Sequence, residues 1–169
     1  LPAAPDHCVA VAHQEAHVVG GGEVLAQRVD DVGVDVVSAL PNVNYLDLSE
    51  CRLCSNDGLK KIGKLTGLRY LGLWETKLND EGLMALGTLA NVVELNLEAT
   101  AITNESAATF LKFQQLQRLN ISGTQLDDEA IRQIATLPKL KWLKLANTSA
   151  SFDILDELAA KEGLEVVDY

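Results

Sequence analysis

The segment Leu65-Thr-Gly-Leu-Arg-Tyr-Leu-Gly-Leu73 decides the fold, because its spacing of leucines returns along most of the chain. Equivalent segments begin at Leu40, Leu89, Phe113 and Leu137. With Leu65 included, successive segments begin 25, 24, 24 and 24 residues apart. A partial copy covers 164–169, and a degenerate copy can be fitted from Ala16 onward. Self-similarity at one fixed period predicts a repeat architecture, in which each unit buries its apolar face only against its neighbours.

Each repeat changes its period partway through. The Leu-x-Leu element alternates apolar and polar residues, which indicates a short strand with one buried face. A small residue follows, then an apolar anchor (Leu53 in one copy, Leu78 in the next), and then apolar residues at helical spacing. Good helix N-cap residues stand before every one of these helices: Ser55, Asn79, Thr103, Asp127 and Ser151. Each unit is therefore predicted to be strand, turn and short helix.

This pattern resembles the leucine-rich repeat family, with Thr where Asn is more common, and Leu48-Ser-Glu-Cys51 fits the cysteine-containing form of the repeat. The resemblance implies an α/β fold: a right-handed solenoid with a parallel sheet on its concave face and short helices on its convex face. We expect residues 16–169 to form about six repeats, the first degenerate and the last partial. Residues 1–15 are predicted to form an N-terminal capping segment, with apolar residues at helical spacing. The small residues, mostly Thr, are expected to bond to turn backbone of the next coil.

Alternation within the strands places three rows of side chains on the concave surface. The first row is Tyr45, Tyr70, Glu94, Arg118 and Trp142; the second is Asp47, Gly72, Asn96, Asn120 and Lys144; the third is Ser49, Trp74, Glu98, Ser122 and Ala146. These rows hold both tryptophans of a chain that is only 5% aromatic. Trp, Tyr and Arg are enriched at binding hot spots. The predicted partner-binding residues are Tyr45, Asp47, Tyr70, Trp74, Glu94, Asn96, Glu98, Arg118, Asn120, Trp142 and Lys144.

Composition excludes several classes of partner. The chain has 169 residues and a net charge of −10, which argues against nucleic acid, because a surface that follows phosphates needs a basic excess. No apolar run approaches the roughly 18 residues of a membrane span. The expected partner is therefore a protein or peptide.

The cysteines and histidines offer only weak motifs. Cys51-Arg-Leu-Cys54 has redox spacing, and Cys54 stands just before a predicted helix cap; Cys8 is left to pair with Cys51 or with Cys54. His13 and His17 are four residues apart, which on a helix would place two imidazoles on one face. We favour the structural interpretation of both motifs and expect neither metal nor cofactor. The histidines are confined to the N-terminal segment, away from the concave rows, so no catalytic residues and no enzyme are predicted.

The sequence thus predicts a non-enzymatic module that binds a protein or peptide on its concave face. The alternative is a structural or assembly domain, joined to more of itself or to other modules through an uncovered strand at 166–169. The family resemblance favours an exported or periplasmic location over a cytoplasmic one, and membership of a longer multi-domain protein.

Overall fold

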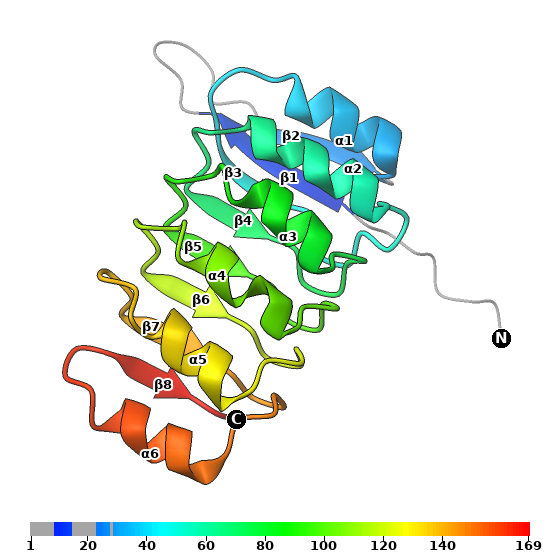
Figure 1. Cartoon of the computed structure of the whole chain (residues 1–169). Helices are drawn as coiled ribbons and strands as arrows, with labels where there is room; N and C mark the ends of the chain where they lie inside the picture. Colours follow the sequence, from blue (N-terminus) through cyan, green and yellow to red (C-terminus); the bar gives the residue numbers. More distant parts are fainter. Residues whose placement is uncertain (1–8, 15–22, 28) are drawn as a thin grey trace, which may run out of the picture.

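The computed structural model describes residues 9–14, 23–27 and 29–169, with side chains from residue 29 onward. The fold is built on one eight-stranded sheet in the order β2-β1-β3-β4-β5-β6-β7-β8, with helices stacked along one of its faces (Figure 1). The six strands of the repeats are parallel: β3 (Val43–Asp47), β4 (Tyr70–Gly72), β5 (Glu94–Asn96), β6 (Arg118–Asn120), β7 (Trp142–Lys144) and β8 (Glu165–Val167). The open parallel solenoid predicted from the repeats is confirmed.

The helices follow the strands at the predicted positions. They are α1 (Asp31–Ser38), α2 (Asn56–Lys60) with the 3-10 helix η1 (Lys61–Lys64), α3 (Asp80–Leu86), the 3-10 helix η2 (Asn104–Ser106) with α4 (Ala107–Phe110), α5 (Asp128–Ile134) and α6 (Phe152–Ala159). All five predicted N-cap side chains accept hydrogen bonds from first-turn amides. Between helices and sheet, the repeat leucines form one continuous buried core, which also includes Phe110 and Phe113.

The N-terminal prediction is wrong where the structure describes it. Residues 9–14 form a strand, β1 (Val9–Gln14), and not a helix. Residues 23–27 form β2 (Glu23–Gln27), and β1 pairs antiparallel with both β2 and β3. The degenerate first copy therefore does not supply a parallel strand. The physical reason is the unpaired edge of β3, whose backbone groups β1 satisfies by pairing.

Polar side chains join consecutive coils on the helical side. The first helical residue of one coil accepts from the N-cap residue of the next. Asp31 accepts from the Ser55 amide at 2.7 Å and from its hydroxyl at 2.6 Å, and Asp128 accepts from Ser151 in the same way. Asp80 likewise accepts from the amide and the hydroxyl of Thr103. Asn56 accepts from the Asn79 amide, and Asn104 accepts from the Asp127 amide. This ladder of hydrogen bonds links each helix to the next.

The threonines that follow the strands, buried except for the half-buried Thr148, act within their own coil. The hydroxyls of Thr76, Thr100, Thr124 and Thr148 each donate to a carbonyl three residues back, at 2.6–2.8 Å. The expectation that they would bond the next coil is wrong, because the strand ends and the chain turns within this same tight segment. Cys51 occupies the equivalent place in its coil.

Candidate functional site: the concave face

The strand register confirms the three predicted rows. Tyr45, Tyr70, Glu94, Arg118 and Trp142 are aligned from β3 to β7, and so are the members of the second row. Backbone bonds past the strand ends, such as Glu75 N to Glu98 O, extend this register to the third row. The alternating leucines point into the core, since Leu46, Leu71 and Leu95 are almost fully buried. The rows between them therefore lie on the face opposite the helices.

The first row begins with an aromatic pair. The rings of Tyr45 and Tyr70 stack face to face, with centroids 4.2 Å apart and an interplanar angle of 6°. Burial and the nearby Asp47 carboxylate raise the pKa of both hydroxyls, so both tyrosines are neutral at physiological pH. Parallel stacking with a polar edge makes a rigid, amphipathic platform.

The first row ends in a charged and aromatic set. Arg118 Nε lies 3.7 Å from Glu94 Oε2, and the Arg118 guanidinium stands 4.4 Å from the Trp142 ring centroid. The Arg118 and Glu94 side chains are about half exposed, at 48% and 47%. An ion pair this open contributes little to stability, and the cation–π contact adds on the order of 0.5–1 kcal/mol at an exposed site. This set is therefore half exposed on the concave face and adds little to the stability of the fold.

The second row is largely structural. The side chains of Asp47, Asn96 and Asn120 each accept the backbone N–H two residues ahead, at 2.9–3.1 Å. These bonds close the turn that follows each strand. Asn120 also donates to Glu98 Oε2 at 2.7 Å, which holds that carboxylate of the third row in place. Three of the predicted binding residues thus shape the surface more than they offer free groups.

Six of the predicted residues surround one hollow of about 170 Å³ on this face: Tyr70, Glu94, Asn96, Arg118, Asn120 and Trp142. Its floor is Leu95 of β5. The hollow is open to solvent between the Tyr70 ring and the Arg118–Trp142 pair. Tyr45, Asp47, Trp74, Glu98 and Lys144 do not line it, and Trp74 is half-buried in the third row.

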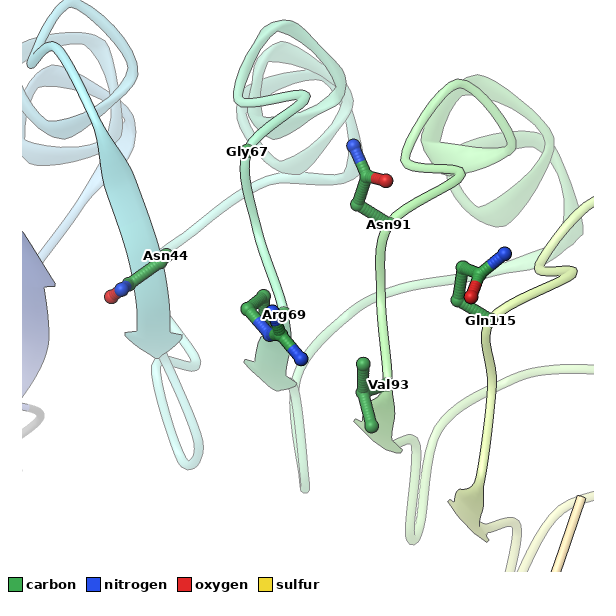
Figure 2. Close-up of a pocket in the computed structure, with 6 residues that line it drawn as sticks. All are labelled: Asn44, Gly67, Arg69, Asn91, Val93 and Gln115. Carbon is green, nitrogen blue, oxygen red and sulfur yellow. The ribbon is translucent and has the colours of Figure 1, made fainter. Parts of the chain in front are cut away.

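A second hollow, which the sequence did not indicate, lies where the chain passes from the helices into the strands. It has about 270 Å³ and is lined by Asn44, Gly67, Arg69, Asn91, Val93 and Gln115 (Figure 2). These residues stand one and three places before the first row in successive coils. Polar residues recur at most of these positions of the repeat, but the positions precede the alternating Leu-x-Leu strands, so the strand pattern does not group them.

The cysteines do not form a redox pair. Cys51 is disulfide-bonded and Cys54 is the free thiol. Burial raises the pKa of the Cys54 thiol to about 12. The Cys54 Sγ donates a hydrogen bond to the Val29 carbonyl oxygen at 3.3 Å. Cys54 is fully buried, whereas Leu53 is 48% exposed, so Cys54 fills the anchor position that Leu78 fills in the next coil. A reactive thiolate needs the opposite environment. Cys8 lies outside the described residues.

The proposed histidine face loses its basis, since His13 belongs to a strand and His17 lies outside the described residues. Within residues 9–14, 23–27 and 29–169, no group of three or more potential metal ligands comes together. None of the described helices is long and apolar enough to cross a membrane.

The chain belongs to the leucine-rich repeat family: a model described as a leucine-rich repeat region matches residues 29–169. A search of curated protein sequences found no match. Among solved structures, the chain is similar to an internalin from Listeria monocytogenes, with 17% identity and a TM-score of 0.52 over 84% of this chain and 52% of that one. It is also similar to a leucine-rich repeat protein from Leptospira interrogans, with 21% identity and a TM-score of 0.55 over 79% of this chain and 38% of that one. The chain thus spans about half, or less, of the length of these two structures, and the likeness concerns the fold.

Proposed function

We propose that this chain is a non-enzymatic module that binds a protein or peptide on its concave face. The observation that carries the proposal is the hollow between the Tyr70 ring and the Arg118–Trp142 pair. Rigid aromatic rings and an arginine beside a recessed surface are the side chains that most often dominate protein binding energy. The leucine-rich repeat fold commonly serves protein–protein interaction, which agrees with this use of the surface.

Charge on this face indicates how a partner would be oriented. Asp47, Glu94 and Glu98 lie over β3 to β5, whereas Arg118 and Lys144 lie over β6 and β7. A partner with the opposite order of charge, basic then acidic along the sheet, would be steered into one orientation. The Glu94–Arg118 contact at 3.7 Å is loose enough for both groups to exchange toward a partner.

The proposal is tested by affinity capture from native extract, comparing the wild-type protein with a Tyr70→Ala, Trp142→Ala double variant. Met84→Ala, which truncates an exposed apolar side chain on the helical face, is the matched control. We expect a partner that wild type and the control retain and the double variant loses, followed by the same ranking with the purified partner in calorimetry. Equal capture by all three proteins, with the double variant still folded by circular dichroism, would refute the concave site.

Assembly through the C-terminal edge is a second candidate, favoured by α6 and β8. β8 is the last strand of the sheet, and Phe152 on α6 is 86% exposed where earlier coils carry a polar ladder residue. Glu165 N and Val167 O point toward β7, so the Val166 backbone groups point outward. Val166→Pro would block an added strand. If sedimentation shows concentration-dependent association that Val166→Pro removes, edge assembly is supported; a wild-type monomer at all concentrations rejects it.

We also propose an exported or periplasmic location within a longer protein. The bonded state of Cys51 supports this, because disulfides persist mainly in oxidising compartments. The partial span over both similar structures agrees with membership of a longer chain. Thiol counting on protein isolated from its source under alkylating conditions tests the location: one free thiol is expected, and three would contradict it.

A further inference from the structure

The second hollow, between the helical and the concave faces, has an unusual lining for so acidic a chain. One guanidinium and three side-chain amides surround it, together with Gly67 and Val93, and no carboxylate is among them (Figure 2). The chain as a whole carries a net charge of −10. Glu94, which follows Val93 in the sequence and begins β5, faces Arg118 on the concave surface. The hollow is therefore a locally electropositive place on a negative molecule.

Arg69 is the cation of this hollow, and it differs from the other described arginines. Arg52, Arg118 and Arg132 each face a carboxylate, those of Glu75, Glu94 and Glu157. The exposed Arg69 side chain makes no ion pair or hydrogen bond within the described part of the chain. Its five N–H groups are a planar fork that matches a carboxylate.

Further donors stand around Arg69. Asn91 Nδ2 donates to the Thr66 carbonyl, and Lys139 Nζ donates to Gln115 Oε1, which orients the Gln115 amide with its N–H groups free. The backbone N–H groups of Gly67, Asn91 and Gln115 have no acceptor among the described residues. The coil repeat brings these three equivalent positions to successive strands, about 4.8 Å apart. The result is a row of hydrogen-bond donors next to one unpaired guanidinium.

We propose that this hollow binds a carboxylate group, supplied by an acidic side chain of a protein segment. Charge-assisted bonds from a guanidinium fork and flanking amides are the usual means of holding such a group. Arg69 and Val93 directly precede Tyr70 and Glu94 on β4 and β5, so a protein seated on the concave face reaches the hollow without a gap. The choice of a protein as the carrier rests on the proposed function; the carboxylate site itself does not.

The test is a titration of the ¹⁵N-labelled protein with pentaglutamate at low salt, followed by NMR. We expect shifts concentrated on the backbone amides of Gly67, Asn91 and Gln115 and on Arg69 Nε. Arg69→Gln should weaken binding about tenfold, which is the loss of one charge-assisted bond. Arg52→Gln is the matched control, because it removes the same charge from an exposed arginine that is already paired with Glu75.

Equal weakening by Arg69→Gln and Arg52→Gln, or shifts spread over the whole surface, would overturn the site in favour of general charge attraction. Binding of tetragalacturonate in the same hollow, without binding of pentaglutamate, would overturn the protein segment as the carrier. The Tyr70→Ala, Trp142→Ala variant keeps Arg69 and its amides, so it should still bind pentaglutamate even if its capture experiment fails. The two proposals can therefore fail separately.

Discussion

At the scale of single residues, one backbone position in each coil is under strain. The residue before the buried Thr or Cys has positive φ in five successive coils, from 51° to 68°: Glu50, Glu75, Ala99, Gly123 and Asn147. A left-handed conformation costs a residue with a Cβ roughly 1–2 kcal/mol. The turn that ends each strand requires it, and only one coil places a glycine there. The sequence pattern does not predict the positive φ at this position, because the residue type there varies from coil to coil.

Replacing Ala99 with Gly should therefore stabilise the protein. The strain relieved exceeds the extra freedom of the unfolded chain, so we expect the free energy of unfolding to rise by about 0.5–1 kcal/mol in urea titration. Gly123→Ala, at φ 68° in the next coil, should lower it by about 1 kcal/mol. Ala90→Gly is the control, because Ala90 is exposed and does not have a positive φ. This substitution should lower the free energy of unfolding. A loss of stability in Ala99→Gly would contradict the argument.

The aspartates of the helical ladder predict a pH dependence of stability. Hydrogen bonds from Ser55 and Ser151 lower the pKa of the Asp31 and Asp128 carboxyl groups below the ordinary value of an aspartate. A folded-state pKa below the unfolded one contributes stability that is present above the unfolded pKa and lost as pH falls through the folded one. Asn fits this place, as Asn56 and Asn104 show in other coils.

An Asp31→Asn, Asp128→Asn variant should thus be less stable than wild type at pH 7. The difference in free energy of unfolding between the two proteins should shrink as pH falls below about 4, because both aspartates of the wild type then protonate. Urea titrations from pH 7 to pH 2.5 measure it. A difference that is constant or grows in acid would show that the ladder charges are not linked to folding.

At the scale of elements, close approach between coils depends on one glycine of η1. A Cβ on Gly63 would stand 2.7 Å from the Ala85 carbonyl oxygen at the end of α3, where Thr88 also donates to the Gly63 carbonyl. Backbone cannot move aside as a flexible side chain can. Gly67, four residues on, would meet only Val43 O, at 3.4 Å.

Gly63→Ala should accordingly lower the free energy of unfolding by about 1–3 kcal/mol, the usual cost of overpacking. Gly67→Ala serves as the control and should change it by less than about 0.5 kcal/mol, as surface substitutions do. The two variants differ from wild type by the same methyl group. Equal effects would mean that coil-to-coil contact at Gly63 does not limit the stacking.

At the scale of the whole molecule, stability is distributed along a line. From β4 to β8 each strand pairs only with its sequence neighbours, and each coil packs its leucines on the next. An end coil therefore has one stabilising interface and a middle coil has two. β8 and α6 form such an end in this structure, and Phe152 leaves their outer side without the polar ladder.

Hydrogen exchange should show this gradient directly. We expect amides of β5 and β6 to exchange only by global opening, and those of α6 and β8 to exchange at least about tenfold faster by local opening. Peptide-level exchange by mass spectrometry gives the comparison within one sample. Uniform protection from β4 to β8 would show that the solenoid opens as one cooperative unit.

The sequence alone determined the solenoid, its register and the members of the concave rows, because these follow from a local pattern copied at a fixed interval. Leu71, Leu95 and Leu119 repeat the same geometry, so one unit predicts the next. The N-caps were equally local and were found for the same reason.

Only the tertiary structure decided what depends on contacts between distant segments. The strand at residues 9–14 forms because the edge of β3 needs a partner, a demand that no periodicity within 9–14 encodes. The use of Asp47 and Asn120 for turn closure, the burial of Cys54 in place of Leu53, and the unpaired Arg69 beside its amides are likewise products of three-dimensional neighbourhood. The local sequence pattern determines on which face of the sheet a side chain lies. Packing between coils decides which polar groups of that side chain are left without a hydrogen-bond partner.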